Sequence, residues 1–186
     1  MKPALTGVNL CANHIADKES FAVQMAEEMK RKTSIVDMVG AGLEFKNVDF
    51  SGQHFYTSNF SQAVFNSCSF YKTIIKICFF DFASFNNCDF SHSIIDYAAL
   101  GGAAIKDCTF CNSDILHVNF NGAAIVDTRF DHSNMYNSRF ITATISSTSF
   151  NDCNVKKVFF IDSSQTNVSF KASNTAEAVY KMDEIL

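Results

Sequence analysis

The chain of 186 residues contains no tryptophan, and it has only seven glycines and a single proline, Pro3. It has no run of 18 apolar residues and therefore no candidate membrane-spanning helix. Its first residues lack the apolar stretch of a secretory signal peptide. With 47% apolar residues and no Pro-, Gly- or Ser-rich linker in its central part, the chain is expected to form one soluble domain. We expect a cytoplasmic protein, with secretion as an effector left open.

Catalytic and metal-binding constellations are also missing from the sequence. The seven cysteines form no CxxC motif, and no Cys/His spacing matches a zinc site. No glycine-rich loop suits a phosphate, and the formal net charge is only −4. The sequence therefore predicts a protein that is not an enzyme, with no cofactor, no metal and no direct nucleic-acid binding.

What the chain has instead is a strict five-residue repeat. Every fifth residue from Phe45 to Phe170 is large and apolar, except Gln165, in 26 positions. Two residues before each of them the side chain is small in 24 of 26 cases, Leu43 and Gln53 being the exceptions. Neither a helix of period 3.6 nor a strand of period 2 keeps one face on this spacing. The repeat predicts a solenoid whose narrow core alternates large and small side chains.

This small-x-Phe/Ile/Leu-x-x pattern resembles the pentapeptide-repeat family over residues 41–170. The resemblance implies an all-β solenoid, a right-handed quadrilateral β-helix with four pentapeptides in each coil. Blocks of 20 residues align in the sequence and support the four-sided coil. One column of core residues recurs at this spacing and is expected to stack at about 4.8 Å per coil: Phe50, Phe70, Phe90, Phe110, Phe130, Phe150 and Phe170.

Both ends depart from the repeat, and we expect a capping helix at each. Residues 1–40 are predicted to form an incomplete first coil (residues 3–15) and a helix over residues 16 to about 32. Residues 171–186 are predicted to form a C-terminal helix capped by Thr175. This helix carries Ala176, Val179, Tyr180 and Leu186. In several relatives this segment forms a dimer, so a homodimer through the C-terminal helix is a second expectation, compatible with capping.

Five of the cysteines occupy small inward positions of the repeat and are interpreted as small buried hydrophobic residues. They are Cys68, Cys78, Cys88, Cys108 and Cys153. Cys111 is predicted to point outward, and Cys11 lies in the N-terminal segment. Either of these two is a candidate reactive thiol.

Most outward positions are polar, but one stripe is apolar. It comprises Tyr56, Ile74, Ile77, Phe79, Phe82, Ile94, Tyr97, Leu116 and Tyr136. A stripe of this size exceeds what a monomer usually exposes, which favours a partner or dimer face. The alternative is that the N-terminal helix, with Phe21, Met25 and Met29, folds back over it.

The core segment from Phe65 to Phe70, with Cys68 between them, resembles the Qnr group of the family. Qnr proteins are dimeric DNA mimics that protect bacterial type II topoisomerases from quinolones, so the resemblance implies DNA gyrase or topoisomerase IV as the partner. Residues 41–170 hold 11 acidic and 8 basic residues, a net charge of −3. A duplex of similar length carries roughly 18 charges. The alternative is an effector or scaffold that binds a protein through the apolar stripe.

Overall fold

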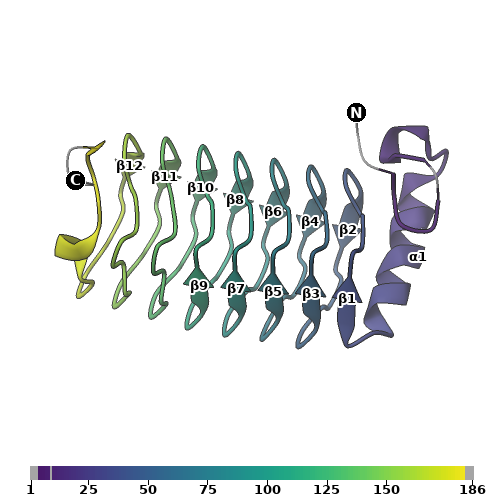
Figure 1. The fold of residues 1–186 in the computed structure, drawn as a ribbon, viewed down its shortest axis with the longest axis horizontal. Helices are drawn as coiled ribbons and strands as arrows, with labels where there is room; N and C mark the ends of the chain where they lie inside the picture. Colours follow the sequence, from purple (N-terminus) through teal and green to yellow (C-terminus); the bar gives the residue numbers. More distant parts are fainter. Residues whose placement is uncertain (1–3, 9, 183–186) are drawn as a thin grey trace.

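The computed structural model describes residues 4–8 and 10–182. The described part of the chain is a parallel β-solenoid with one α-helix, α1 (Lys18–Lys30), across its N-terminal end (Figure 1), and two 3₁₀ turns, Ala12–His14 and Thr175–Glu177. The first sheet contains β1 (Ser34–Val36), β3 (His54–Tyr56), β5 (Ile74–Lys76), β7 (Ile94–Asp96) and β9 (Asp114–Leu116). The second contains β2 (Glu44–Lys46), β4 (Val64–Asn66), β6 (Ser84–Asn86), β8 (Ala104–Lys106), β10 (Ala124–Val126), β11 (Thr144–Ser146) and β12 (Ser164–Thr166). This confirms the predicted all-β solenoid.

Each coil is 20 residues long and has four sides. On two sides the strands pair in parallel with residues 20 positions later, as Ile75 does with Ile95. On the other two sides single bridges repeat at the same interval, from Val39 to Val179 and from Asp49 to Ser169. In chain order we name the sides A (first sheet), B (the Val39 ladder), C (second sheet) and D (the Asp49 ladder). The predicted alignment of 20-residue blocks is thus the register of the ladders.

The corners of every coil are made by residues with a left-handed backbone. At each second residue after a large core position, from Asp37 to Ala172, φ lies between +47° and +72°. Gly, Asn and Asp adopt this conformation with the least strain, and they fill many of these corners. The two remaining outward positions of each repeat flank the inward-pointing large residue.

Phenylalanine rings stack through the middle of the solenoid. The centroids of Phe90 and Phe110 lie 4.5 Å apart with an interplanar angle of 2°, and those of Phe110 and Phe130 lie 4.8 Å apart at 8°. Six of the seven predicted core phenylalanines are buried, whereas Phe170, in the last coil, is half-buried. The ring spacing follows from the strand spacing, because equivalent residues on adjacent coils are one ladder step apart.

The helix α1 covers the N-terminal end of the solenoid. Asp17 caps it by accepting a hydrogen bond from the N–H of Ser20 at 3.0 Å. Met25 and Met29 are buried against the first coil. The side-chain amide of Gln53 donates to the main-chain oxygens of Met29 at 2.8 Å and Lys32 at 3.1 Å. Gln53 breaks the small-residue column because it ties the end of the helix to the solenoid.

Strand pairing starts at β1, before the predicted boundary at residue 41. The predicted incomplete coil contains no strand in residues 4–8 and 10–15. Instead, Thr6 hydrogen-bonds to Val39, with its N–H donating to the Val39 oxygen at 3.0 Å. Leu5 and Ala12 are buried, but Leu10 is exposed, so the five-residue phase does not describe this segment.

The predicted C-terminal helix is wrong for the residues that the structure describes. Only one 3₁₀ turn forms, over Thr175–Glu177. Val179 then continues the side B ladder: its N–H donates to Val158 at 2.8 Å, and its oxygen accepts from Phe160 at 2.8 Å. The ring of Tyr180 stacks on Phe160 at 5.7 Å. The preceding coil offers these residues backbone partners, which outweighs their helical pattern. Leu186 lies outside the described residues. The homodimer expected through the C-terminal segment stays a prediction.

No helix in the described part of the chain is long and apolar enough to span a membrane.

Candidate interaction surface

The nine residues of the predicted apolar stripe divide into two groups by exposure. Tyr56, Ile74, Leu116 and Tyr136 are half-buried. The exposed fraction is 54% for Ile77, 46% for Phe79, 69% for Phe82, 38% for Ile94 and 60% for Tyr97. We call these five exposed residues the apolar patch.

The apolar patch extends around two corners of adjacent coils. Ile94 lies on side A, in β7. Ile77 and Tyr97, 20 residues apart, lie at the corner between sides A and B. Phe79 lies in the side B ladder, and Phe82 lies at the next corner, between sides B and C. The patch therefore extends from side A across side B to the next corner.

The alternative that the N-terminal helix covers the stripe is wrong. The buried residues of α1, including Met25 and Met29, face the end of the solenoid. Gly40 provides the close contact there, because a Cβ at this position would lie 2.7 Å from the Phe60 ring and 3.3 Å from the Met25 sulfur. The helix closes the end of the rod and leaves the patch open.

Three residues of the patch have a backbone conformation that their side chains disfavour. The φ angles of Ile77, Phe82 and Tyr97 are 55°, 57° and 53°. Bulky and especially β-branched residues are rare in this left-handed region, which costs about 1–2 kcal/mol per L-residue. The other corner positions from residue 37 to residue 172 are small or polar. Large apolar residues therefore occur at corners only within the patch, where local strain favours a functional explanation.

A pair of glycines on the next coil holds Phe82 in place. A Cβ on Gly102 would lie 2.6 Å from the Phe82 ring, so this ring lies over the Gly102 backbone. The N–H of Gly101 donates to the carboxylate of Asp81 at 3.1 Å. Sequence reasoning missed these two glycines. Their signal was the offset of 20 residues that places them beside Asp81 and Phe82.

Aromatic side chains extend the patch along the corner between sides A and B. The ring of Tyr97 stacks on His117 with centroids 4.5 Å apart, and His117 contacts Tyr136 edge-on at 6.0 Å. The Nδ1 atom of His117 lies 3.3 Å from a carboxylate oxygen of Asp96. These contacts fix the orientation of Tyr97, and they connect the half-buried Tyr136 to the patch.

Of the five cysteines predicted to point inward, four have a raised thiol pKa, whereas hydrogen bonding to Cys88 lowers the pKa of Cys108. Burial raises the pKa of Cys78 to about 11 and that of Cys153 to about 11. Hydrogen bonding to Cys108 raises the pKa of Cys88 to about 12. Cys111 is buried, so its predicted outward exposure is wrong; it is flanked one coil later by the buried Asp131. In residues 4–8 and 10–182, no three His, Cys, Asp or Glu side chains are arranged to hold a metal ion.

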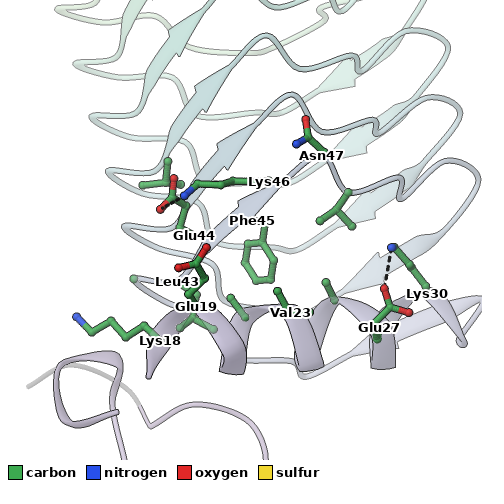
Figure 2. Close-up of a pocket in the computed structure, with 15 residues that line it drawn as sticks. Lys18, Glu19, Val23, Glu27, Lys30, Leu43, Glu44, Phe45, Lys46 and Asn47 are labelled. Atoms are coloured by element: carbon green, nitrogen blue, oxygen red, sulfur yellow. Dashed lines mark hydrogen bonds and ion pairs between the residues drawn. The ribbon is translucent and has the colours of Figure 1, made fainter. Parts of the chain in front are cut away.

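A second feature, absent from the sequence prediction, is a pocket of about 450 Å³ between α1 and β2. Figure 2 shows Val23 of the helix and Phe45 of the strand on facing sides of it. Val23 was the one residue of the sequence that could have indicated this pocket. It is exposed on the outer face of the capping helix, where an apolar residue has no role in the cap.

Comparison with known families agrees with the repeat. The family model described as "Pentapeptide repeats" matches the chain in eight copies, with residues 44–76 as the matched range. The chain is therefore a member of the pentapeptide-repeat family. None of the curated proteins compared with the chain matches it.

Several solved structures are similar to the chain. A trypsin-treated form of QnrB1, a plasmid-mediated fluoroquinolone resistance protein, is 16% identical; the match covers 75% of this chain and 81% of that one, with a TM-score of 0.41. A pentapeptide repeat protein from the Arabidopsis thaliana thylakoid lumen is 21% identical over 65% and 67%, with a TM-score of 0.34. HetL, a protein involved in heterocyst differentiation regulation from the cyanobacterium Nostoc, is 9% identical over 90% and 98%, with a TM-score of 0.36. Fluoroquinolone resistance and the regulation of heterocyst differentiation are functions of QnrB1 and HetL, respectively.

Proposed function

We propose that the chain is a non-catalytic binding module that holds a protein partner on the apolar patch. One observation carries this proposal: Ile77, Phe82 and Tyr97 are exposed at corners where their side chains strain the backbone. Folding alone favours Gly, Asn or Asp at these positions. Residues that violate a local rule without stabilising the fold are expected at functional sites.

The size of the patch suits the centre of a protein interface. At about 200 Å² for each fully exposed large side chain, the exposed fractions correspond to roughly 500 Å² of accessible surface. A stable interface buries about 800 Å² on each partner. The polar side chains around the patch supply the remainder as a rim. The partner is a folded protein with an apolar socket for Phe82, because large aromatic side chains dominate binding when they fill such pockets.

The matched pair Phe82→Asp and Thr142→Asp tests this function. Thr142 occupies the same corner three coils later, and both residues have a φ of 57°. Tagged variants are used for quantitative affinity purification from cells. We expect a defined set of proteins to be retained by the wild type and by Thr142→Asp but lost with Phe82→Asp. Equal retention by both variants would refute the patch as the binding site.

A type II topoisomerase is the specific partner that we propose within this function, acting in the cytoplasm. The repeat from Phe65 to Phe70, with Cys68 inward, supports it through its similarity to the Qnr group. A gyrase supercoiling assay with purified protein, with and without a fluoroquinolone, tests the choice at low and moderate salt. Inhibition or drug protection that fades with salt supports a DNA mimic. No effect at tens of micromolar eliminates the topoisomerase and leaves the patch for another protein.

The effector or scaffold alternative uses the same patch and predicts a different salt dependence. Apolar contacts of Ile77, Phe79 and Phe82 are not screened by salt, whereas charge mimicry is. Residues 41–170 carry 11 acidic and 8 basic residues, a net charge of only −3. This balance favours a partner bound mainly through apolar contact.

A further inference from the structure

The pocket between α1 and β2 has two walls of different kinds (Figure 2). One face of the helix forms the first wall, with Lys18, Glu19, Ala22, Val23, Ala26, Glu27 and Lys30. The residues from Gly42 to Val48, which include β2, form the second wall, together with Val64. The pocket therefore follows a whole helix face on one side and a strand edge on the other.

The strand edge that lines the pocket has unpaired main-chain groups. In the following coils, the residue at the Glu44 position donates its N–H to the preceding coil: Val64 to Leu43 at 2.8 Å and Ser84 to Ala63 at 2.9 Å. β2 is the terminal strand of its sheet and pairs only with β4. On the side away from β4, the N–H groups of Glu44 and Lys46 therefore have no strand to pair with.

The helix explains why this edge stays open. Twenty residues before β2, the solenoid register would require a strand at residues 24–26, but these residues belong to α1. A helix satisfies its own main-chain groups and cannot complete the ladder of β2. In a parallel strand, the N–H and C=O of alternate residues point to the same edge. Glu44 and Lys46 thus present two donors and two acceptors to the pocket.

The dimensions suit an extended chain. From Lys18 to Lys30 the helix wall is about 18 Å long, at 1.5 Å per residue, and an extended strand of about five residues covers this length. In the middle of the helix wall, the small side chains of Ala22 and Ala26 line the pocket. Val23 is 57% exposed and offers apolar contact there. Charged pairs, Glu27 with Lys30 and Glu44 with Lys46, border the apolar floor.

We propose that this pocket binds an extended peptide segment of a partner protein, which adds a strand to the free edge of β2. Only a polypeptide backbone supplies donors and acceptors at the spacing of Glu44 and Lys46, so a peptide is favoured over an apolar small molecule. Alternate side chains of the peptide face Val23 and the helix, and a small apolar residue fits there. This surface lies on side C of the first coil, apart from the apolar patch.

Lys46→Pro tests the strand addition directly. It removes a donor on the side of β2 that faces no strand, and proline is tolerated on edge strands, so the fold should be retained. Lys46→Ala is the matched control, because it removes the same charge and keeps the N–H. The probe is a phage library of random heptapeptides selected on the wild-type protein, followed by fluorescence anisotropy of the enriched peptides.

We expect enriched peptides with alternating apolar residues that bind the wild type and Lys46→Ala alike. Lys46→Pro should weaken their binding at least about tenfold, as should N-methylation of alternate peptide nitrogens. No enrichment, or enriched peptides that bind Lys46→Pro equally well, would overturn the proposal. Self-association that Lys46→Pro abolishes in sedimentation would overturn it in favour of a second copy of the chain.

A second variant keeps the test decisive if Lys46→Pro does not fold. Val23→Trp fills the pocket from the helix side without touching β2. Val36→Trp is its control, since Val36 is 55% exposed on side A against 57% for Val23. Peptide binding should fall at least about tenfold for Val23→Trp and remain unchanged for Val36→Trp. Equal affinity of both variants would contradict the assigned pocket.

Discussion

Phe110→Ala should destabilise the solenoid far more than Phe170→Ala. The Phe110 side chain is fully buried, and its ring stacks between Phe90 and Phe130 at 4.5 and 4.8 Å. Truncation of a buried Phe costs about 3–5 kcal/mol because the surrounding core relaxes only partly. Rigid neighbouring coils prevent collapse of the cavity, so we expect a value in the upper half of this range.

Phe170 is the matched control at the end of the rod. It is half-buried, and within its own column it stacks on a single ring, Phe150, at 5.0 Å. Half of a Phe transfer energy and one ring contact together give about 1–3 kcal/mol. Urea unfolding followed by circular dichroism measures both values. A loss for Phe110→Ala below about 2 kcal/mol, or no larger than that for Phe170→Ala, would refute a tightly packed central core.

Three further predictions concern corners and charge. Gly102→Ala and Gly122→Ala should each lower the free energy of unfolding by about 1–2 kcal/mol in thermal unfolding, because the φ angles of these glycines are 63° and 67°. Only Gly102→Ala should reduce partner binding, since its Cβ displaces the ring of Phe82. Phe82→Asn should leave the free energy of unfolding unchanged or raise it, although it removes an aromatic residue; a loss above about 1 kcal/mol contradicts the strain argument. Burial raises the pKa of Asp131, but hydrogen bonds, including one from the N–H of Asn151 at 2.9 Å, hold it below its usual value. The ionised Asp131 therefore contributes to the free energy of unfolding above about pH 4, and this contribution is lost as the pH falls further. Asp131→Asn should flatten the decrease in stability at acid pH in a stability–pH curve.

The repeat made the fold predictable because its period has one structural solution. Phe45 to Phe170 repeat every five residues, and neither a helix nor a flat strand buries such a column. The ends were less predictable. The pattern of the segment around Val179 is typical of a helix, but backbone groups of the preceding coil were available to it as hydrogen-bond partners. A local sequence pattern does not show which of these two structures is more stable.

The apolar patch was partly predictable, because outward apolar residues are visible once the phase is known. Exposure separated Phe82 and Tyr97 from the half-buried Tyr56 and Tyr136. The strain at Ile77 became apparent only with the φ angles, since the sequence does not state which outward position turns the corner. The open edge of β2 was not predictable, because it depends on the replacement of a strand by α1.

Site-specific photocrosslinking tests the central claim most directly, since it reports contact at a chosen side chain. A photoreactive phenylalanine analogue replaces Phe82 in one protein and Thr142 in another, two positions with the same φ on the same corner. We expect a defined protein adduct from position 82, none from position 142, and loss of the first when Ile77→Asp is added. The same adducts from both positions, or an adduct from position 82 that Ile77→Asp leaves unchanged, would contradict this claim.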